Sequence, residues 1–259
     1  MVNFTYAILA FLAGIITWII TSIGAGVVFF FKKVNKTTMD AMLGLSAGVM
    51  IAATFFSLLS PAIAMCENLN FNSWLIVSVG FLLGGLLLFF GDKYFNKLIS
   101  KKNSNKLKRS IMLIFSITLH NIPEGAAIGV AFGSIAYHLN GATLTAAILL
   151  AVGIGIQNFP EGSAISLPLK RDGMTSKKAF MYGCLSGIVE PISAFIGAIL
   201  VMKVRFLLPI LLAFAAGAMI YVVVEELIPE SQTNEKKDLM ALFTIIGFII
   251  MMIFDIALG

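Results

Sequence analysis

A stretch of nine residues occurs twice in the sequence and carries the side chains best suited to chemistry. His120–Ile128 reads HNIPEGAAI and aligns with Gln157–Ile165, which reads QNFPEGSAI. Asn, Pro, Glu, Gly, Ala and Ile recur in register, which is too extensive a match for chance. The two copies therefore predict one composite site built from two similar segments.

The spacing within each copy indicates what that site would bind. His120 and Glu124 are four residues apart, as are Gln157 and Glu161, so each pair shares one face of a helix. Each proline also leaves the carbonyl oxygen four residues earlier without its helical donor. Imidazole, carboxylate and amide oxygen together suit zinc, iron, manganese or cadmium. An oxygen-only set would instead favour calcium or magnesium.

Three acidic residues lie in apolar stretches with no lysine or arginine at similar depth. These are Glu124, Glu161 and Glu190. A carboxylate in hydrocarbon is costly and needs a partner or a path to water. Either protons or a cation must neutralise the group, and a proton relay stays open for any single glutamate. The repeat favours a cation site.

The composition indicates what surrounds these residues. Of the 259 residues, 59% are hydrophobic and 12% are charged, whereas about a quarter are charged in soluble domains. A spanning helix needs roughly 20 apolar residues. We therefore expect an all-α integral membrane protein, one transmembrane domain over 1–259, in which eight helices form a bundle and the fourth and fifth hold the metal site. The predicted helices are 4–31, 40–65, 72–90, 110–137, 141–169, 178–202, 206–229 and 239–258.

The basic residues predict the orientation of that bundle. All of the 18 lysines and arginines except Lys203 and Arg205 fall in alternate links between the predicted helices. The positive-inside rule places those links in the cytoplasm and both termini outside. The longest link, 92–109, is expected to be a flexible cytoplasmic loop. Its charge suits anionic membrane lipids as partners better than nucleic acid.

At HNIPEG and QNFPEG the chain resembles the ZIP family of divalent metal transporters, in particular its bacterial branch without a histidine-rich loop. Similar stretches occur at 48–58, 189–191 and 225–230. The resemblance covers essentially the whole chain. It implies a multi-pass protein of the bacterial plasma (inner) membrane that works by sliding one helix group against another, often as a homodimer.

The resemblance also implies a two-metal site and a path through it. The first metal would be held by His120, Glu124, Gln157 and Glu161, with Met50 close by. The second would use Asn121, Glu124, Asn158, Glu161 and Glu190, so that Glu124 and Glu161 bridge. Asn158 stands where some relatives carry an acid, which lowers the charge of the second site. Ser57 would lie at the outer entrance and Glu226 on the inner release path, beside Glu225, where some relatives carry histidine.

These features predict uptake of divalent metal ions into the cytoplasm, with zinc or iron first and cadmium or manganese also fitting. The metal is the transported substrate and no cofactor is expected. The sequence has no GxxxxGK[ST] loop for ATP, so an ion gradient or the membrane potential would drive transport. Two alternatives remain: an intramembrane metal-dependent enzyme and a metal sensor that does not transport. The HExxH motif and paired ExxH motifs of metal enzymes are absent.

Overall fold

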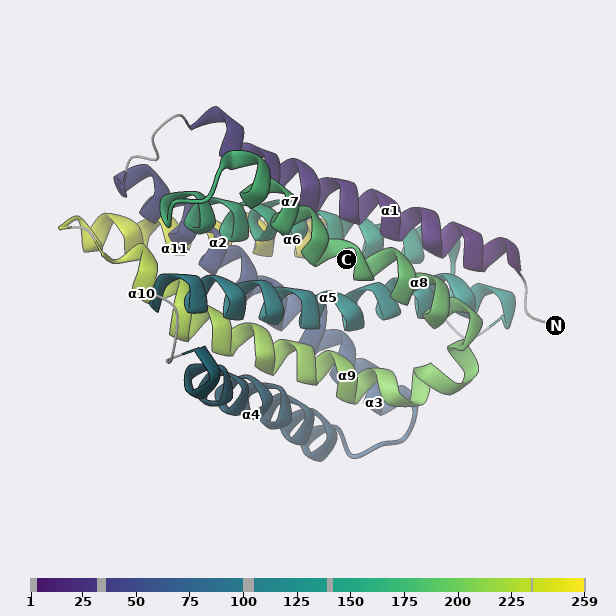
Figure 1. Ribbon diagram of the computed structural model, residues 1–259. Helices are drawn as coiled ribbons and strands as arrows, with labels where there is room; N and C mark the ends of the chain where they lie inside the picture. Colours follow the sequence, from purple (N-terminus) through teal and green to yellow (C-terminus); the bar gives the residue numbers. More distant parts are fainter. Residues whose placement is uncertain (1–3, 32–35, 100–104, 139–141, 234, 259) are drawn as a thin grey trace.

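The computed structural model describes residues 4–31, 36–99, 105–138, 142–233 and 235–258, and the regular structure within these ranges is entirely helical (Figure 1). The expected all-α fold is thus confirmed. The α-helices are α1 Phe4–Gly26, α2 Lys36–Ala53, α3 Ser60–Asn68, α4 Ser73–Ile99, α5 Asn105–Ala136, α6 Leu144–Arg171, α7 Ser176–Gly187, α8 Val189–Ile199, α9 Val201–Val222, α10 Ile228–Ser231 and α11 Lys237–Leu258. A 3-10 turn, η1 (Val27–Phe30), follows α1, and two π-helical segments, η2 (Thr54–Leu59) and η3 (Val223–Leu227), interrupt longer helices.

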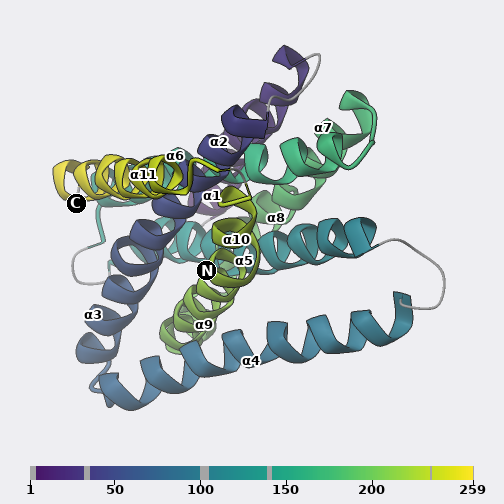
Figure 2. The same ribbon diagram turned by 90° about the vertical axis from the view of Figure 1, so that its left-hand side faces the viewer.

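Seven helical segments of the described chain are long and apolar enough to cross a bilayer. Among them, α4 and α11 are the least buried and lie at the periphery of the bundle (Figure 2). The protein is therefore a multi-pass membrane protein.

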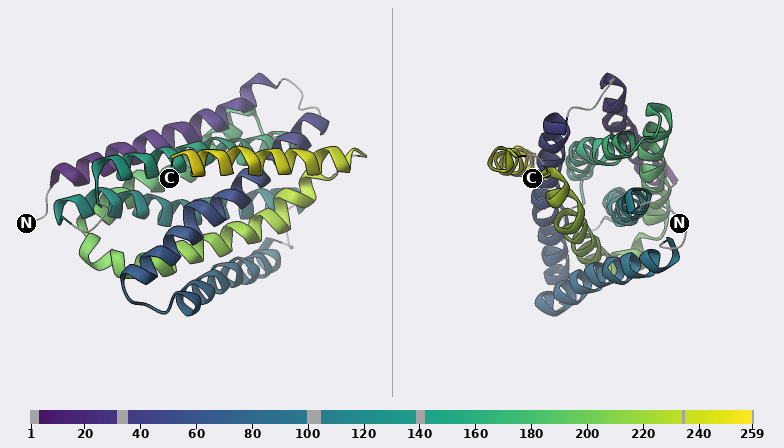
Figure 3. Two further views of the ribbon diagram at one scale, coloured as in Figure 1. Left: turned by 180° about the vertical axis from the view of Figure 1, so that it is seen from behind. Right: turned by 60° about the vertical axis from the view of Figure 1, so that its left-hand side comes forward.

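The helix that carries HNIPEG, α5, is 32 residues long and lies in the middle of the bundle. It packs against α1, α4, α6, α7, α8 and α9, and Figure 3 shows it surrounded by other helices. Every residue from Pro123 to Val130 is buried. The predicted helix 110–137 is thus present as α5, at the centre of the bundle.

Two expectations about the elements need correction. Residues 92–109 were expected to form a loop, but α4 continues to Ile99 and α5 begins at Asn105, and 100–104 lies outside the described residues. Lysine is a good helix former, so a helix can continue past the apolar stretch into water. The predicted helix 178–202 is divided at Ile188 into α7 and α8.

Close glycine contacts divide the helices into two sets. A Cβ on Gly162 of α6 would lie 2.0 Å from the backbone oxygen of Thr21 in α1, and one on Gly129 of α5 would lie 2.2 Å from that of Ala194 in α8. We call α1, α5, α6, α7 and α8 the site group. A Cβ on Gly48 of α2 would likewise lie 1.9 Å from a backbone oxygen of α11. Small residues at such points let helices approach closely.

The remaining helices, α2, α3, α4, α9, α10 and α11, form the support group. A Cβ on Gly84 of α4 would lie 1.9 Å from the backbone oxygen of Phe214 in α9. Each close contact of a described glycine joins helices of the same group. The boundary between the groups, mainly α5 on α9 and α2 on α6, is therefore packed through side chains. Such a boundary is suited to small sliding movements of packed helices.

Candidate metal site

The two copies of the repeat meet where α5 packs against α6. His120 Nε2 lies 3.2 Å from Glu161 Oε2. Ligand atoms of His120, Glu124 and Glu161 lie within 4.8 Å of one another, and all three side chains are fully buried. The expected four-residue spacing thus brings an imidazole and two carboxylates to one point. That they bind a metal ion remains a prediction.

Gln157 completes this cluster from the second copy of the repeat. Its Nε2 donates a hydrogen bond to Glu124 Oε1, and its Oε1 accepts none. The Gln157 amide therefore fixes Glu124 through its nitrogen, and its oxygen can accept a further partner. All four residues predicted for the first metal are gathered in the same buried region.

The remaining predicted ligands lie on the side of the cluster that faces α7 and α8. Asn158 Nδ2 donates to Glu190 Oε2 at 2.7 Å, and Asn121 Nδ2 donates to the backbone oxygen of Ser186 at 3.1 Å. Glu190 stands at the start of α8, directly after the break, and is close enough to Glu161 to interact with it electrostatically. The structure thus brings Glu190 to the repeat.

Glycines of the repeat make this closeness possible. A Cβ on Gly125 would lie 2.5 Å from the backbone oxygen of Glu190, and Gly162 makes the contact with α1 described above. Each glutamate of the repeat is thus followed by a residue that lets a neighbouring backbone approach. The repeated Glu-Gly pair serves the chemistry and the packing of the site together.

The acceptor atoms of the site lack donors to an unusual degree. Buried polar groups in folded proteins nearly always have a hydrogen-bond partner, and a buried carboxylate is costly without compensation. The described ion pairs of arginine, with Asp172 and Glu230, do not involve this cluster. The buried oxygens that accept no hydrogen bond include Asn121 Oδ1, Glu124 Oε2, Gln157 Oε1, Asn158 Oδ1, both carboxylate oxygens of Glu161 and Glu190 Oε1.

This donor set can neutralise and coordinate a divalent cation. Imidazole nitrogen with carboxylate oxygens is a set that zinc accepts, and amide oxygens add neutral ligands. A cation would satisfy at once several acceptors that the protein leaves unpaired. The chemistry of the residues present therefore fits a transition-metal ion as predicted from the sequence.

The residues predicted for the transport path coincide with the two π-helical segments. Ser57 lies in η2, and Glu225 and Glu226 lie in η3. Pro61 and Pro229 follow Ser57 and Glu225 by four residues and have no N–H to offer their carbonyls. Instead, Ser60 N–H donates to the oxygen of Phe55 and Ile228 N–H to that of Val223, which widens the helix at both places. Segments of this kind are frequent at functional sites.

Sequence reasoning missed an acidic partner of Ser57. Ser57 Oγ donates to Asp255 Oδ1 of α11 at 3.0 Å, and Asp255 Oδ2 is buried without a donor. Both residues line a pocket of about 400 Å³ between η2, α6 and α11. Asp255 lies inside an apolar run near the end of α11, where it is half-buried. An acid inside an apolar run is a functional signal by default, and Asp255 carried it.

Three other residues were predicted to act on the metal: Met50 lies in α2, and Glu225 and Glu226 lie in η3. Met50 is fully buried in α2, in the same hydrophobic cluster as Ala127 and Ala164, which follow the two glutamates of the repeat. Glu225 is exposed and Glu226 is half-buried. Their roles toward a metal stay predictions.

Fold and site together define a class: a multi-pass helical membrane protein with a buried cluster of histidine, carboxylates and amides at its centre. A sequence model described as ZIP zinc transporter matches residues 102–255. The chain is 37% identical to zinc transporter ZIP11 of Xenopus tropicalis over 96% of each chain. It is 34% identical to zinc transporter ZIPB of Bordetella bronchiseptica, over 100% of this chain and 83% of that protein.

Zinc transporter ZupT of Clostridium perfringens is 31% identical over 96% of this chain and 95% of its own length. The chain therefore belongs to the ZIP zinc transporter family. Its similarity extends to animal and bacterial members alike, so the comparisons do not single out the bacterial branch.

Proposed function

We propose that this chain takes up Zn²⁺ into the cytoplasm through the buried site between α5 and α6. Membership of the ZIP family makes the protein a transporter of divalent metal rather than an enzyme. The observation that carries the proposal for this site is the set of buried oxygens of Glu124, Glu161 and Glu190 that accept no hydrogen bond. In an apolar bundle these groups call for a cation.

In this proposal the ion exchanges water for protein ligands in the middle of the membrane. His120, Glu124 and Glu161 bind it as they lose their protons, since ionisable metal ligands must be deprotonated, and Gln157 adds its neutral amide oxygen. The hydrogen bond from Gln157 fixes Glu124 in position. Full burial of the cluster keeps the dielectric low, which strengthens the attraction between ion and carboxylates.

We assign the two ends of the path to the two π-helical segments. The pocket of Ser57 and Asp255 offers a serine hydroxyl and a carboxylate at the outer end. Glu225 and Glu226 offer carboxylates at the basic, inner end. Sliding of the site group against the support group would expose the buried cluster first to one end and then to the other.

We assign a second, weaker metal position to Asn121, Asn158 and Glu190, bridged by the two glutamates of the repeat. Asn158 and Glu190 are joined by a hydrogen bond of 2.7 Å, so the amide nitrogen occupies one carboxylate oxygen. A neutral amide here leaves the position with less negative charge. The weaker position is suited to a regulatory or transient ion.

Further proposals concern substrates and setting. Iron, cadmium and manganese fit the same ligand types and are proposed as additional substrates. The placement of the basic residues supports both termini outside the plasma membrane of a bacterium. A homodimer is proposed from the family resemblance.

Proteoliposomes that enclose a zinc-sensing dye test the proposed function. We expect wild-type protein to carry zinc inward and Glu161→Ala and His120→Ala to lose most of the flux. Glu67→Ala, at an exposed acid near the end of α3, is the matched control and should transport normally. Equal flux in all four proteins would overturn the site assignment. Zinc binding without flux in the wild type would instead identify a sensor.

A further inference from the structure

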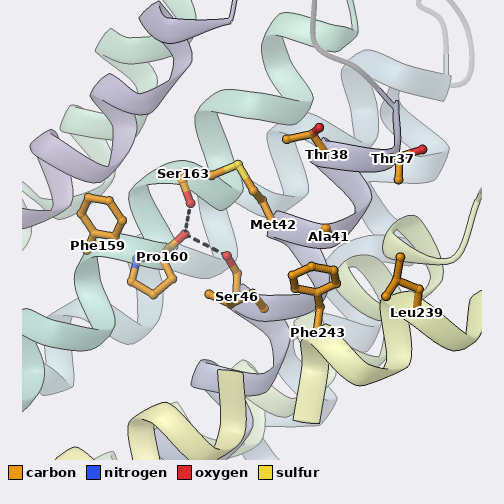
Figure 4. Close-up of a pocket in the computed structure, with 11 residues that line it drawn as sticks. Thr37, Thr38, Ala41, Met42, Ser46, Phe159, Pro160, Ser163, Leu239 and Phe243 are labelled. Atoms are coloured by element: carbon orange, nitrogen blue, oxygen red, sulfur yellow. Dashed lines mark hydrogen bonds between the residues drawn. The ribbon is translucent and has the colours of Figure 1, made fainter. Parts of the chain in front are cut away.

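A second pocket lies behind the metal-binding helix, at the boundary between the two helix groups. It has a volume of about 440 Å³ and is formed by α2, α6 and α11, with Met42, Phe159, Pro160, Leu239 and Phe243 among its walls (Figure 4). Ligand-binding pockets range over about 300–1,000 Å³. None of the predicted metal ligands lines this pocket.

The pocket opens toward the outside of the bundle. Phe159 is 40% exposed and Leu239 is 41% exposed, and both lie in segments long and apolar enough to span a bilayer. The medium on that side is therefore the lipid of the membrane. An apolar recess that faces hydrocarbon is shaped to take an acyl chain.

One end of the pocket is polar, and the exposed lysines beside it, at 36, 236 and 237, outnumber the exposed acids, at 235 and 238. Thr37 and Thr38, at the start of α2, line it, and Lys36 directly precedes them. Lys36 Nζ donates to the backbone oxygen of Thr233 at 2.7 Å, which keeps its ammonium at this end of the bundle. Lys237, also exposed, begins α11 two residues before Leu239. Clustered lysines at a membrane surface attract anionic lipid headgroups.

We propose that this pocket binds an anionic phospholipid, with one acyl chain in the recess and the phosphate near Lys36 and Lys237. A chain gains little from the apolar wall alone, because the surrounding lipid is equally apolar. The preference therefore comes from the charge of the headgroup. Phosphatidylglycerol should bind in preference to phosphatidylcholine.

The floor of the pocket is the back of the metal-ligating segment. Phe159 and Pro160 stand between Asn158 and Glu161, and the oxygen of Pro160 accepts hydrogen bonds from Ser163 Oγ at 2.8 Å and from Ser46 Oγ of α2 at 3.3 Å (Figure 4). The walls come from both groups, α6 from one and α2 with α11 from the other. A bound lipid would bridge the sliding boundary and stabilise the arrangement seen here. This effect on transport rests on the proposed function, whereas the binding does not.

Native mass spectrometry of protein released from nanodiscs of equal phosphatidylglycerol and phosphatidylcholine tests the binding. Wild type should retain one phosphatidylglycerol molecule in preference to phosphatidylcholine. Ala41→Trp, which fills the pocket, should lose that lipid. Ala241→Trp, at an exposed alanine of α11 outside the pocket wall, should retain it.

A second pair of variants does not depend on the folding of a filled pocket. Lys237→Gln should lower the preference for phosphatidylglycerol several-fold, whereas Lys177→Gln, an exposed lysine at the start of α7, should leave it unchanged. Equal retention of both lipids by wild type, or an unchanged lipid in Ala41→Trp, would overturn the proposal. So would a dimer that Ala41→Trp dissociates, because a second copy would then cover the pocket. Lipid retention is measured without zinc, so a failure of metal transport would leave it unaffected.

Discussion

At the scale of single residues, the site joins groups that an apolar interior ordinarily excludes. Glu161 is fully buried, and neither carboxylate oxygen accepts a hydrogen bond. His120 Nε2 lies 3.2 Å from its Oε2. Such a carboxylate lowers the stability of the metal-free protein and raises the affinity for a cation, so stability and function are opposed at this residue.

Glu161→Gln separates these two effects. The substitution keeps the shape and removes the buried charge, so we expect zinc affinity to fall at least tenfold. We expect the melting temperature of the metal-free protein to rise, by roughly 2–4 °C for each kcal/mol of relief. Calorimetry measures both quantities in detergent. Lower stability without zinc would show that the protein itself compensates this carboxylate.

Acid should inhibit transport through the same residues. Zinc and protons compete for His120 and the glutamates, and histidine is ordinarily protonated below a pH of about 6.5. Lowering the pH on both sides of a proteoliposome from neutral to about 5 should therefore raise the zinc concentration for half-maximal flux. His120→Gln should weaken that dependence, since one competing proton site is gone. A flux that stays constant down to pH 5 would contradict proton competition at the cluster.

Much of this site was predictable from the sequence. A repeat with a four-residue spacing predicted which side chains of α5 and α6 would meet, because helix geometry fixes that relation locally. The contact of Asp255 with Ser57 was not predictable, since it joins segments far apart in the chain. Only the packing of α11 on α2 decides that this acid turns inward.

At the scale of elements, a proline follows each of the two π-helical segments. Pro61 and Pro229 each follow a π-helical segment, and in each case the preceding residue bonds five residues back. Hydropathy predicted these segments as uninterrupted helices. Apolar content does not depend on whether an N–H bonds to the oxygen four or five residues earlier, so it cannot distinguish the α form from the π form. Hydropathy also ended the predicted helix 72–90 too early, because α4 continues to Ile99 through residues that are too polar for the membrane.

Pro229→Ala tests the role of the inner π-helical segment. Alanine supplies the missing N–H, so the helix can bond to the oxygen of Glu225 and revert to the α form, which turns Glu225 and Glu226 to new directions. We expect zinc affinity at the central site to stay the same and the maximal flux to fall several-fold. Pro209→Ala, within α9 of the same segment, is the control. If flux is unaltered while binding is intact, the π form has no part in release.

At the scale of the whole molecule, the site group and the support group meet along a boundary packed by side chains. Within each group, close contacts at glycines join the helices. The helix α6, which carries the predicted ligands Gln157, Asn158 and Glu161, is tied to both groups at its basic end. Lys170 Nζ donates to the backbone oxygens of Val28, at 3.0 Å, and of Phe31, within the site group. The next residue, Arg171, pairs with Glu230 of α10, in the support group. At this end of α6, Lys170 thus bonds within the site group and Arg171 pairs with a residue of the support group.

The Arg171–Glu230 pair should therefore set the balance between arrangements of the two groups. Its side chains are 29% and 10% exposed, so water screens it only partly, and pairs in contact are coupled by about 0.5–3 kcal/mol. Arg171→Glu or Glu230→Arg alone puts like charges together and should shift the groups apart at the basic end. The double exchange restores opposite charges and should restore the flux of wild type. A double variant as impaired as either single variant would show that the two residues act separately, which would remove the link across the boundary.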